Sequence, residues 1–189
     1  ELADALAQGG DPRAIPNLWV KARGGEIVRN APRPFLEDLD ALPFADRELV
    51  DYQAVINSDF HTALFMFSRG CPYDCTFCSN HALRGKQPGR YVRFRSVDSC
   101  LAEIGAVPRR YAARTLYFND DCFTAQRAFV EAFCARYPRE FQHPFAIHAR
   151  PETRNDEVCR MLREAGCARV SIGIESGSDR VLEAVRKGV

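Results

Sequence analysis

The sequence predicts an α/β protein built from parallel strand–helix repeats. Three observations predict this fold class. Short apolar segments alternate with amphipathic segments four times beyond residue 60, polar residues suited to capping precede the amphipathic segments, and a chain with 46% apolar and 27% charged residues has a globular composition. This alternation gives a parallel sheet with right-handed crossovers, either as an open sheet or as an unfinished barrel.

Residues 1–60 are expected to form an irregular arm ahead of the repeat. Five prolines interrupt this segment, which lacks sustained helical or strand periodicity. Within it, Gly24 and Gly25 separate the apolar-bounded segments 19–23 and 26–29, which predicts a small hairpin. The predicted division is therefore an arm at 1–60 and a strand–helix domain at 61–189.

Four apolar segments are predicted strands, and the first and last are nearly continuous in apolar residues, as in strands covered on both faces. The strands are residues 63–68, 115–119, 145–149 and 168–174. Four helices are predicted, each beginning at a polar residue, namely Ser96, Thr124, Asn155 and Ser178. We expect the second helix to end at Tyr137, because Pro138 blocks its continuation.

Composition excludes several classes of function. With 26 basic and 25 acidic residues, the net charge of +1 gives no field that would recruit nucleic acid. The apolar runs are far shorter than the roughly 20 residues of a membrane span, and the first residues do not resemble a secretory signal. Eight cysteines in a chain able to bury a core indicate reduced thiols, and hence the cytoplasm. Since no initiator Met is present, we expect a piece of a longer protein.

The strongest functional signal is a cysteine loop directly after the first predicted strand. Cys71, Cys75 and Cys78 fall within eight residues, in a Cys-x3-Cys-x2-Cys run that follows Gly70 and contains Pro72. Three thiolates converging on one metal centre leave a coordination position open for substrate or cofactor. The alternative is a closed zinc site, with His81 as fourth ligand, in a zinc-stabilised binding module.

The run 69–78 resembles the signature of the radical S-adenosylmethionine (SAM) superfamily, in which an aromatic residue, here Phe77, precedes the third cysteine. Segments 38–44, 118–124 and 173–178 resemble the cobalamin-dependent class of that superfamily. The resemblance covers residues 15–188. It implies a partial TIM-type barrel with four of six strands, the missing strands beyond Val189, and a cobalamin domain ahead of the chain.

The resemblance also implies the chemistry. Cys71, Cys75 and Cys78 would bind three irons of a four-iron four-sulfur cluster, and the fourth iron would chelate SAM. An electron from the cluster would cleave SAM to methionine and a 5'-deoxyadenosyl radical, which abstracts hydrogen from a small-molecule substrate. Methyl transfer from cobalamin to an unactivated carbon is the expected reaction, with ring formation and methylthiolation as alternatives. A degenerate domain that keeps the cluster without turnover is a further alternative.

Polar residues at the ends of the predicted strands are the expected SAM-binding residues. The resemblance implies that Phe77 contacts the adenine and that Asp120 or Asp121 contacts the ammonium. Arg150 could pair with the carboxylate, and Glu175 could bond the ribose or the amino group. The alternatives are a helix N-terminal turn for the aspartates and internal ion pairs for Arg150 and Glu175.

Several other features receive a structural interpretation. His148 on an apolar strand is expected to be a core residue, and no catalytic residue is assigned. The remaining five cysteines are expected to be buried small hydrophobes. The basic run 84–95 is expected to be a solvated face, although it could meet an anionic substrate, a partner domain or an electron donor such as a flavodoxin or ferredoxin.

Overall fold

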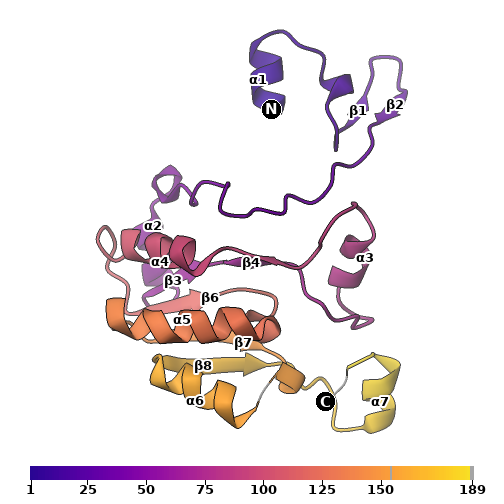
Figure 1. Cartoon of the computed structure of the whole chain (residues 1–189). Helices are drawn as coiled ribbons and strands as arrows, with labels where there is room; N and C mark the ends of the chain where they lie inside the picture. Colours follow the sequence, from indigo (N-terminus) through magenta and orange to yellow (C-terminus); the bar gives the residue numbers. More distant parts are fainter. Residues whose placement is uncertain (154, 188–189) are drawn as a thin grey trace.

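The computed structural model describes residues 1–153 and 155–187, and a four-stranded parallel sheet lies at its centre. The sheet has the order β3-β6-β7-β8 (Figure 1), and its strands are β3 (Thr62–Phe65), β6 (Thr115–Phe118), β7 (Phe145–Ala149) and β8 (Cys167–Ile172). Because β3 and β8 are the two edges, the barrel is open. The predicted partial barrel of parallel strand–helix units is therefore confirmed.

The prediction of a single strand over residues 63–68 is wrong. It divides into β3 and β4 (Ser68–Arg69), and β4 pairs antiparallel with β5 (Arg93–Phe94). The physical reason is a contact distant in sequence, because one carboxylate oxygen of Asp120 accepts the backbone N–H groups of Phe67 and Ser68. The chain therefore leaves the parallel sheet after Phe65. The last predicted strand ends two residues early, at Ile172.

Three helices cover one face of the sheet, namely α4 (Val97–Ala106), α5 (Arg127–Glu140) and α6 (Asp156–Glu164). Ser96 and Asn155 cap α4 and α6 as predicted, each accepting an N–H from the first turn. Thr124 does not cap α5, because it lies within a 3₁₀ turn, η3 (Phe123–Ala125), and Gln126 occupies the N-cap position of the helix.

The predicted stop at Pro138 is also wrong, because α5 continues to Glu140. The proline removes one helical N–H donor near the end of the helix. Two contacts hold the last turn nevertheless: the hydroxyl of the buried Tyr137 donates to the carbonyl of His143, and the N–H of Phe141 reaches the carbonyl of Tyr137.

The core lies between the sheet and these helices and is rich in aromatic rings. Phe118 of β6 is fully buried, with the rings of Phe67 and Phe145 each 5.0 Å away between centroids. Burial of such side chains supplies the main driving force for folding. The opposite face of the sheet is different, because Leu64 remains 37% exposed there. The expectation that β3 is covered on both faces is therefore wrong for the described residues.

The arm contains the predicted hairpin and several short helices. Strands β1 (Trp19–Lys21) and β2 (Ile27–Arg29) pair antiparallel around the Gly24-Gly25 turn. The short elements of the arm are α1 (Leu2–Ala7), η1 (Pro12–Ala14), η2 (Arg47–Leu49) and α2 (Tyr52–Ser58). Ile56 of α2 is fully buried in the main core. A domain boundary at residue 60 thus stays a prediction.

Two arginines of the basic run fasten the arm to the sheet. Arg93 and Arg95 are buried rather than solvated. Arg93 donates to the carbonyl of Leu36 at 2.6 Å, and Arg95 donates to the carbonyls of Leu42 and Pro43, both at 3.2 Å. The expectation of a solvated face is therefore wrong for these two positions.

Two short helices lie beside the carboxyl ends of the strands, α3 (Asn80–Arg84) and α7 (Asp179–Ala184) (Figure 1). The fourth predicted helix thus begins directly after Ser178, as expected, although the side chain of Ser178 makes no capping hydrogen bond. None of the helices in the part of the chain that the structure describes is long and apolar enough to cross a membrane.

The aromatic core yields a stability prediction. Phe118→Ala should lower the free energy of unfolding by about 3–5 kcal/mol, since it removes a buried ring and leaves a cavity. Phe60→Ala is the matched control, because Phe60 is 88% exposed, and it should change stability by less than about 0.5 kcal/mol. Urea denaturation followed by circular dichroism measures both values, and similar losses for the two variants would contradict the placement of Phe118.

Candidate active site

The cysteine loop begins where β4 ends, and its first turn needs a glycine. Gly70 has φ +82°, and a Cβ there would lie 2.8 Å from the ring and the carbonyl of Tyr91. Arg84 of α3 donates to the carbonyls of Cys71 and Tyr73, at 3.0 and 3.3 Å. The loop is therefore held at its start and along its first half by contacts from residues 84–91.

A cavity of about 340 Å³ collects most of the predicted site residues. It opens at the carboxyl ends of β6, β7 and β8. Its lining comprises Cys71, Cys75, Phe77, Cys78, Asn80, Asp121, His148, Ala149, Arg150, Ser171, Ile172, Gly173, Glu175 and Lys187. The volume falls within the range of small-molecule sites. All three cysteines and four of the five predicted SAM-binding residues thus meet in one place.

The two neighbouring aspartates have different positions. Asp121 lines the cavity and is exposed. Asp120 is fully buried, and its Oδ1 accepts the N–H of Phe67 at 2.9 Å and the N–H and hydroxyl of Ser68 at 2.5 and 2.6 Å. Burial raises the pKa of Asp120 by more than these hydrogen bonds lower it. Asp120 therefore supports the backbone, and Asp121 is the aspartate available to a ligand.

Arg150, directly after β7, is buried against the cysteine loop. Its Nη1 lies 2.6 Å from the sulfur of Cys75, and its guanidinium lies 3.9 Å from the centroid of the Tyr73 ring. Glu152 pairs with the other side of the guanidinium. Burial alone lowers the pKa of Arg150, but the bonds to Glu152 and Cys75 raise it overall. The side chain is thus a fixed positive charge beside one cysteine.

Glu175, Lys187 and Phe77 close another side of the cavity. Glu175 has φ +69° and forms an ion pair with Lys187 at 3.2 Å. The ammonium of Lys187 is buried, at 5.9 Å from the centroid of the Phe77 ring. Sequence reasoning missed Lys187, and its only signal was the end of a predicted helix.

The uncovered face of the sheet adds a second group that sequence reasoning missed. The hydroxyl of Tyr117 lies 2.6 Å from Nε2 of His148, and that nitrogen lies 3.2 Å from Oδ1 of Asn119. His148 also lines the cavity, so the expectation that it is a core residue is wrong. Alternation along β6 and β7 places these side chains on one face. That pattern was visible in the sequence, but the pairing of the two strands was not.

The thiols differ in their surroundings. Burial raises the pKa of Cys71, and all eight cysteines of the chain are free. Of the other five, Cys100, Cys122 and Cys134 are buried as expected, whereas Cys159 is exposed and Cys167 is partly exposed. For these last two the expectation of burial is wrong.

The zinc alternative is not favoured by the side-chain positions. His81 is exposed on α3 and is not part of the cavity lining.

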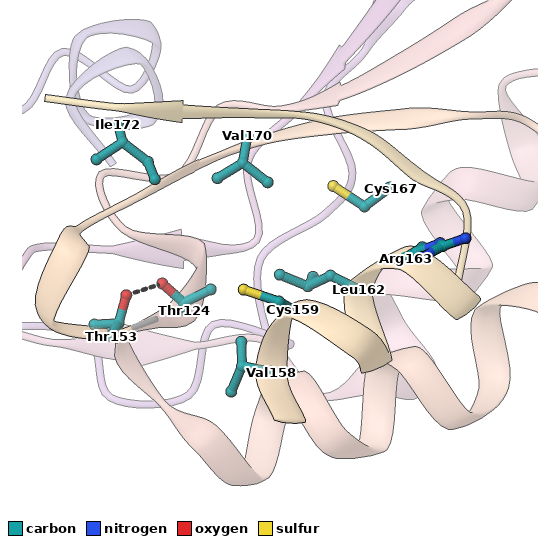
Figure 2. A pocket seen from close by; sticks show the side chains of 9 residues that line it. All are labelled: Thr124, Thr153, Val158, Cys159, Leu162, Arg163, Cys167, Val170 and Ile172. Carbon is teal, nitrogen blue, oxygen red and sulfur yellow. Dashed lines mark hydrogen bonds between the residues drawn. The ribbon is translucent and has the colours of Figure 1, made fainter. Parts of the chain in front are cut away.

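A second, apolar pocket of about 150 Å³ lies between α6 and the edge strand β8 (Figure 2). Val158 and Leu162 of α6 face Val170 and Ile172 of β8 across it, and Thr124 and Thr153 are hydrogen-bonded at its end. Four aliphatic side chains and two cysteines make up most of this lining. The pocket is therefore a gap in packing at the sheet edge and adds no chemistry to the cysteine cavity.

These features define a class of protein, a parallel α/β domain that presents three cysteines at the carboxyl ends of its strands, as metal–sulfur cluster domains do. The model of one family, the Radical SAM superfamily, matches residues 65–189. The chain therefore belongs to the Radical SAM superfamily, whose members are enzymes.

Relatives and solved structures agree with this assignment. An uncharacterised methyltransferase of Pyrococcus horikoshii is 30% identical over 190 residues, which cover all of this chain and 40% of that protein. The anaerobic magnesium-protoporphyrin IX monomethyl ester cyclase of Synechocystis is 27% identical over 197 residues, which cover all of this chain and 37% of that protein. The chain thus spans well under half the length of these relatives.

The fold is similar to that of the radical S-adenosylmethionine methyltransferase TsrM from Kitasatospora setae. One structure of TsrM, solved with tryptophan substrate and a SAM analogue, has a TM-score of 0.75 at 17% identity. The match covers all of this chain and 38% of that chain. Another structure of TsrM, with cobalamin and a [4Fe-4S] cluster bound, has a TM-score of 0.71. At this identity the likeness concerns the fold.

The raised pKa of Asp120 predicts a pH-dependent stability. A native pKa above the unfolded value means that protonated Asp120 stabilises the fold at low pH, and that this contribution is lost as the pH rises through the native pKa. Asp120→Asn keeps an acceptor oxygen without titrating. Urea unfolding between about pH 4 and pH 8 should show that wild-type stability, minus that of the variant, falls with rising pH.

Asp121→Asn is the control for this measurement. Asp121 is exposed at the cavity, so its substitution should leave the pH profile of stability close to that of the wild type. A difference between wild type and Asp120→Asn that grows with rising pH would mean a lowered native pKa and would contradict the prediction.

Proposed function

We propose that this chain is the cluster-binding and SAM-binding part of a cobalamin-dependent radical SAM methyltransferase. The observation that carries the proposal is the single cavity at the carboxyl ends of the strands. Three cysteines, two acidic residues and two basic residues converge there. The methyltransferase name of the relative that is 30% identical supports methyl transfer over ring formation.

The residues present fit a four-iron four-sulfur cluster. Such clusters are held by cysteine thiolates, and Cys71, Cys75 and Cys78 would supply one thiolate to each of three irons. The positive charge of Arg150 beside Cys75 offsets part of the negative charge that three thiolates bring. When bound, the cluster and SAM supply a 5'-deoxyadenosyl radical that abstracts hydrogen from the substrate.

The chain's own residues would hold SAM. Asp121 provides a carboxylate for the ammonium, and Glu175 provides one for the ribose hydroxyls or the amino group. Phe77, which is 56% exposed, presents a ring for the adenine. Arg150 has N–H groups that are not engaged by Glu152 or Cys75, and these could donate to the carboxylate of SAM. Asp120 takes no direct part in this proposal.

Several partners follow from the proposal. The substrate would be a small molecule lying over the uncovered face of the sheet, near Tyr117 and His148. Cobalamin would be bound by other parts of the full-length protein, since the binding of cobalamin by TsrM supports the class and this chain carries no cobalamin motif of its own. A flavodoxin or ferredoxin would supply the electron. Eight free thiols support the cytoplasm as the compartment.

Metal analysis tests the cluster directly. After anoxic purification and reconstitution, the chain should contain about four irons and four acid-labile sulfides. The Cys71→Ala/Cys75→Ala/Cys78→Ala variant should lose both, while Cys159→Ala, at an exposed cysteine outside the loop, should retain both. Zinc without sulfide in the wild type would contradict the proposal and would favour the binding module.

The side chain of Glu175 lies close to Gly173, and this contact allows a second test, which concerns SAM binding. A Cβ on Gly173 would collide with Oε1 of Glu175 and would lie 3.1 Å from Nζ of Lys187. Gly173→Ala should therefore displace the Glu175 carboxylate and weaken SAM binding about tenfold, with the iron content unchanged.

Gly177→Ala is the matched control, because a Cβ there meets nothing within 4 Å. Anoxic equilibrium dialysis with labelled SAM gives the affinities. Equal affinities for Gly173→Ala, Gly177→Ala and the wild type would remove Glu175 from the proposed site.

A further inference from the structure

Arg150 is a cation that donates directly to a cysteine sulfur in the cavity. Its Nη1 lies 2.6 Å from Sγ of Cys75, and both side chains are buried, with 6% of each residue exposed. Hydrogen bonds to charged partners gain strength in such surroundings, where water does not compete for the donor. The contact is thus a strong local influence on one of the three cysteines.

The guanidinium cannot turn away from this sulfur without losing its other contacts. Glu152 accepts from Nε at 3.1 Å and also pairs with Nη2. The ring of Tyr73 covers the guanidinium plane at 3.9 Å from its centroid. Because Tyr73 lies two residues before Cys75, the same loop that carries the sulfur also fixes the cation above it.

The sulfur of Cys78 accepts from a neutral donor, unlike the sulfur of Cys75. The donor to its sulfur is the neutral amide of Asn80, at 3.5 Å, and the hydroxyl of Tyr91 holds that amide in place at 2.6 Å. The described contacts therefore place a charged donor on Cys75 and a neutral donor on Cys78. The thiolate of Cys75 is therefore more strongly stabilised than the thiolate of Cys78.

We propose that Arg150 raises the reduction potential of the cluster by donating to the sulfur of Cys75. This inference rests on the proposed function, because it requires a cluster on the three cysteines. Hydrogen bonds to the cluster's sulfurs and nearby charge set the potential of an iron–sulfur centre. A fixed cation stabilises the form that holds one more electron, so it favours reduction by a low-potential flavodoxin or ferredoxin. Arg150 is then a positioning residue that acts through Cys75.

The test is a redox titration of the reconstituted full chain, without SAM, followed by electron paramagnetic resonance. In Arg150→Met, the ratio of reduced to oxidised cluster at a fixed applied potential should fall about tenfold, which corresponds to about 59 mV for one electron. Arg150→Lys keeps the charge without the planar donor, and Arg150→Gln keeps a donor without the charge. For both variants, the ratio of reduced to oxidised cluster should lie between the ratios of the wild type and Arg150→Met.

Arg169→Met is the control for a charge removed elsewhere. Arg169 is exposed on β8 and stacks on the ring of Tyr117, 5.3 Å from its centroid. Its removal should leave the potential at the wild-type value. Working without SAM separates the proposal from a role in binding the SAM carboxylate, because such a role would change SAM affinity and leave this potential unchanged.

The outcomes separate the two proposals. A wild-type chain that assembles the cluster, together with Arg150 variants that titrate as the wild type does, would overturn the role of Arg150 and leave the proposed function standing. If Arg150→Met does not load its cluster, the Lys and Gln variants decide the question by the same criterion. A wild-type chain without iron and sulfide would overturn both.

Discussion

One buried carboxylate, that of Asp120, determines where the cysteine loop begins. Three donors from Phe67 and Ser68 converge on its Oδ1, at the point where the chain would otherwise continue along β3. Leaving those buried donors unpaired would cost about 1–3 kcal/mol each. The chain therefore turns toward β5, and the loop starts beside the ends of β6 and β7. Every contact between the loop and Arg150 depends on this turn.

Arginine side chains serve a related purpose in the irregular parts of the chain. Carbonyl groups outside helices and sheets need donors when they are buried, and a guanidinium offers five N–H groups in a fixed plane. Arg84 supplies donors to two loop carbonyls, and Arg93 and Arg95 supply them to the arm. These arginines thus have a structural reason, because each supplies donors to carbonyl groups of an irregular segment.

Sequence reasoning predicted those features that depend on neighbouring residues. The sheet and helices follow from local periodicity, and the caps at Ser96 and Asn155 follow from side chains that accept N–H groups three residues ahead. The break in the strand after Phe65 was not predicted from the sequence, because it depends on Asp120, which is more than 50 residues away. The choice between Asp120 and Asp121 was not predicted for the same reason, because only the contacts of Asp120 with the distant residues Phe67 and Ser68 show which of the two is buried.

The two faces of the sheet explain how the proposed SAM site and the proposed substrate site can be continuous. Aromatic rings fill most of the face beneath α4, α5 and α6, and the pocket that remains there, between α6 and β8, is mainly apolar. The other face carries Tyr117 and His148, and His148 and Ser171 also line the cysteine cavity. A substrate lying on this face would have its reacting carbon next to the bound SAM. The hydrogen-bonding pair of Tyr117 and His148 would then select for a polar group beside that carbon, while Leu64 and Met66, both partly exposed near the end of β3, would contact an apolar part.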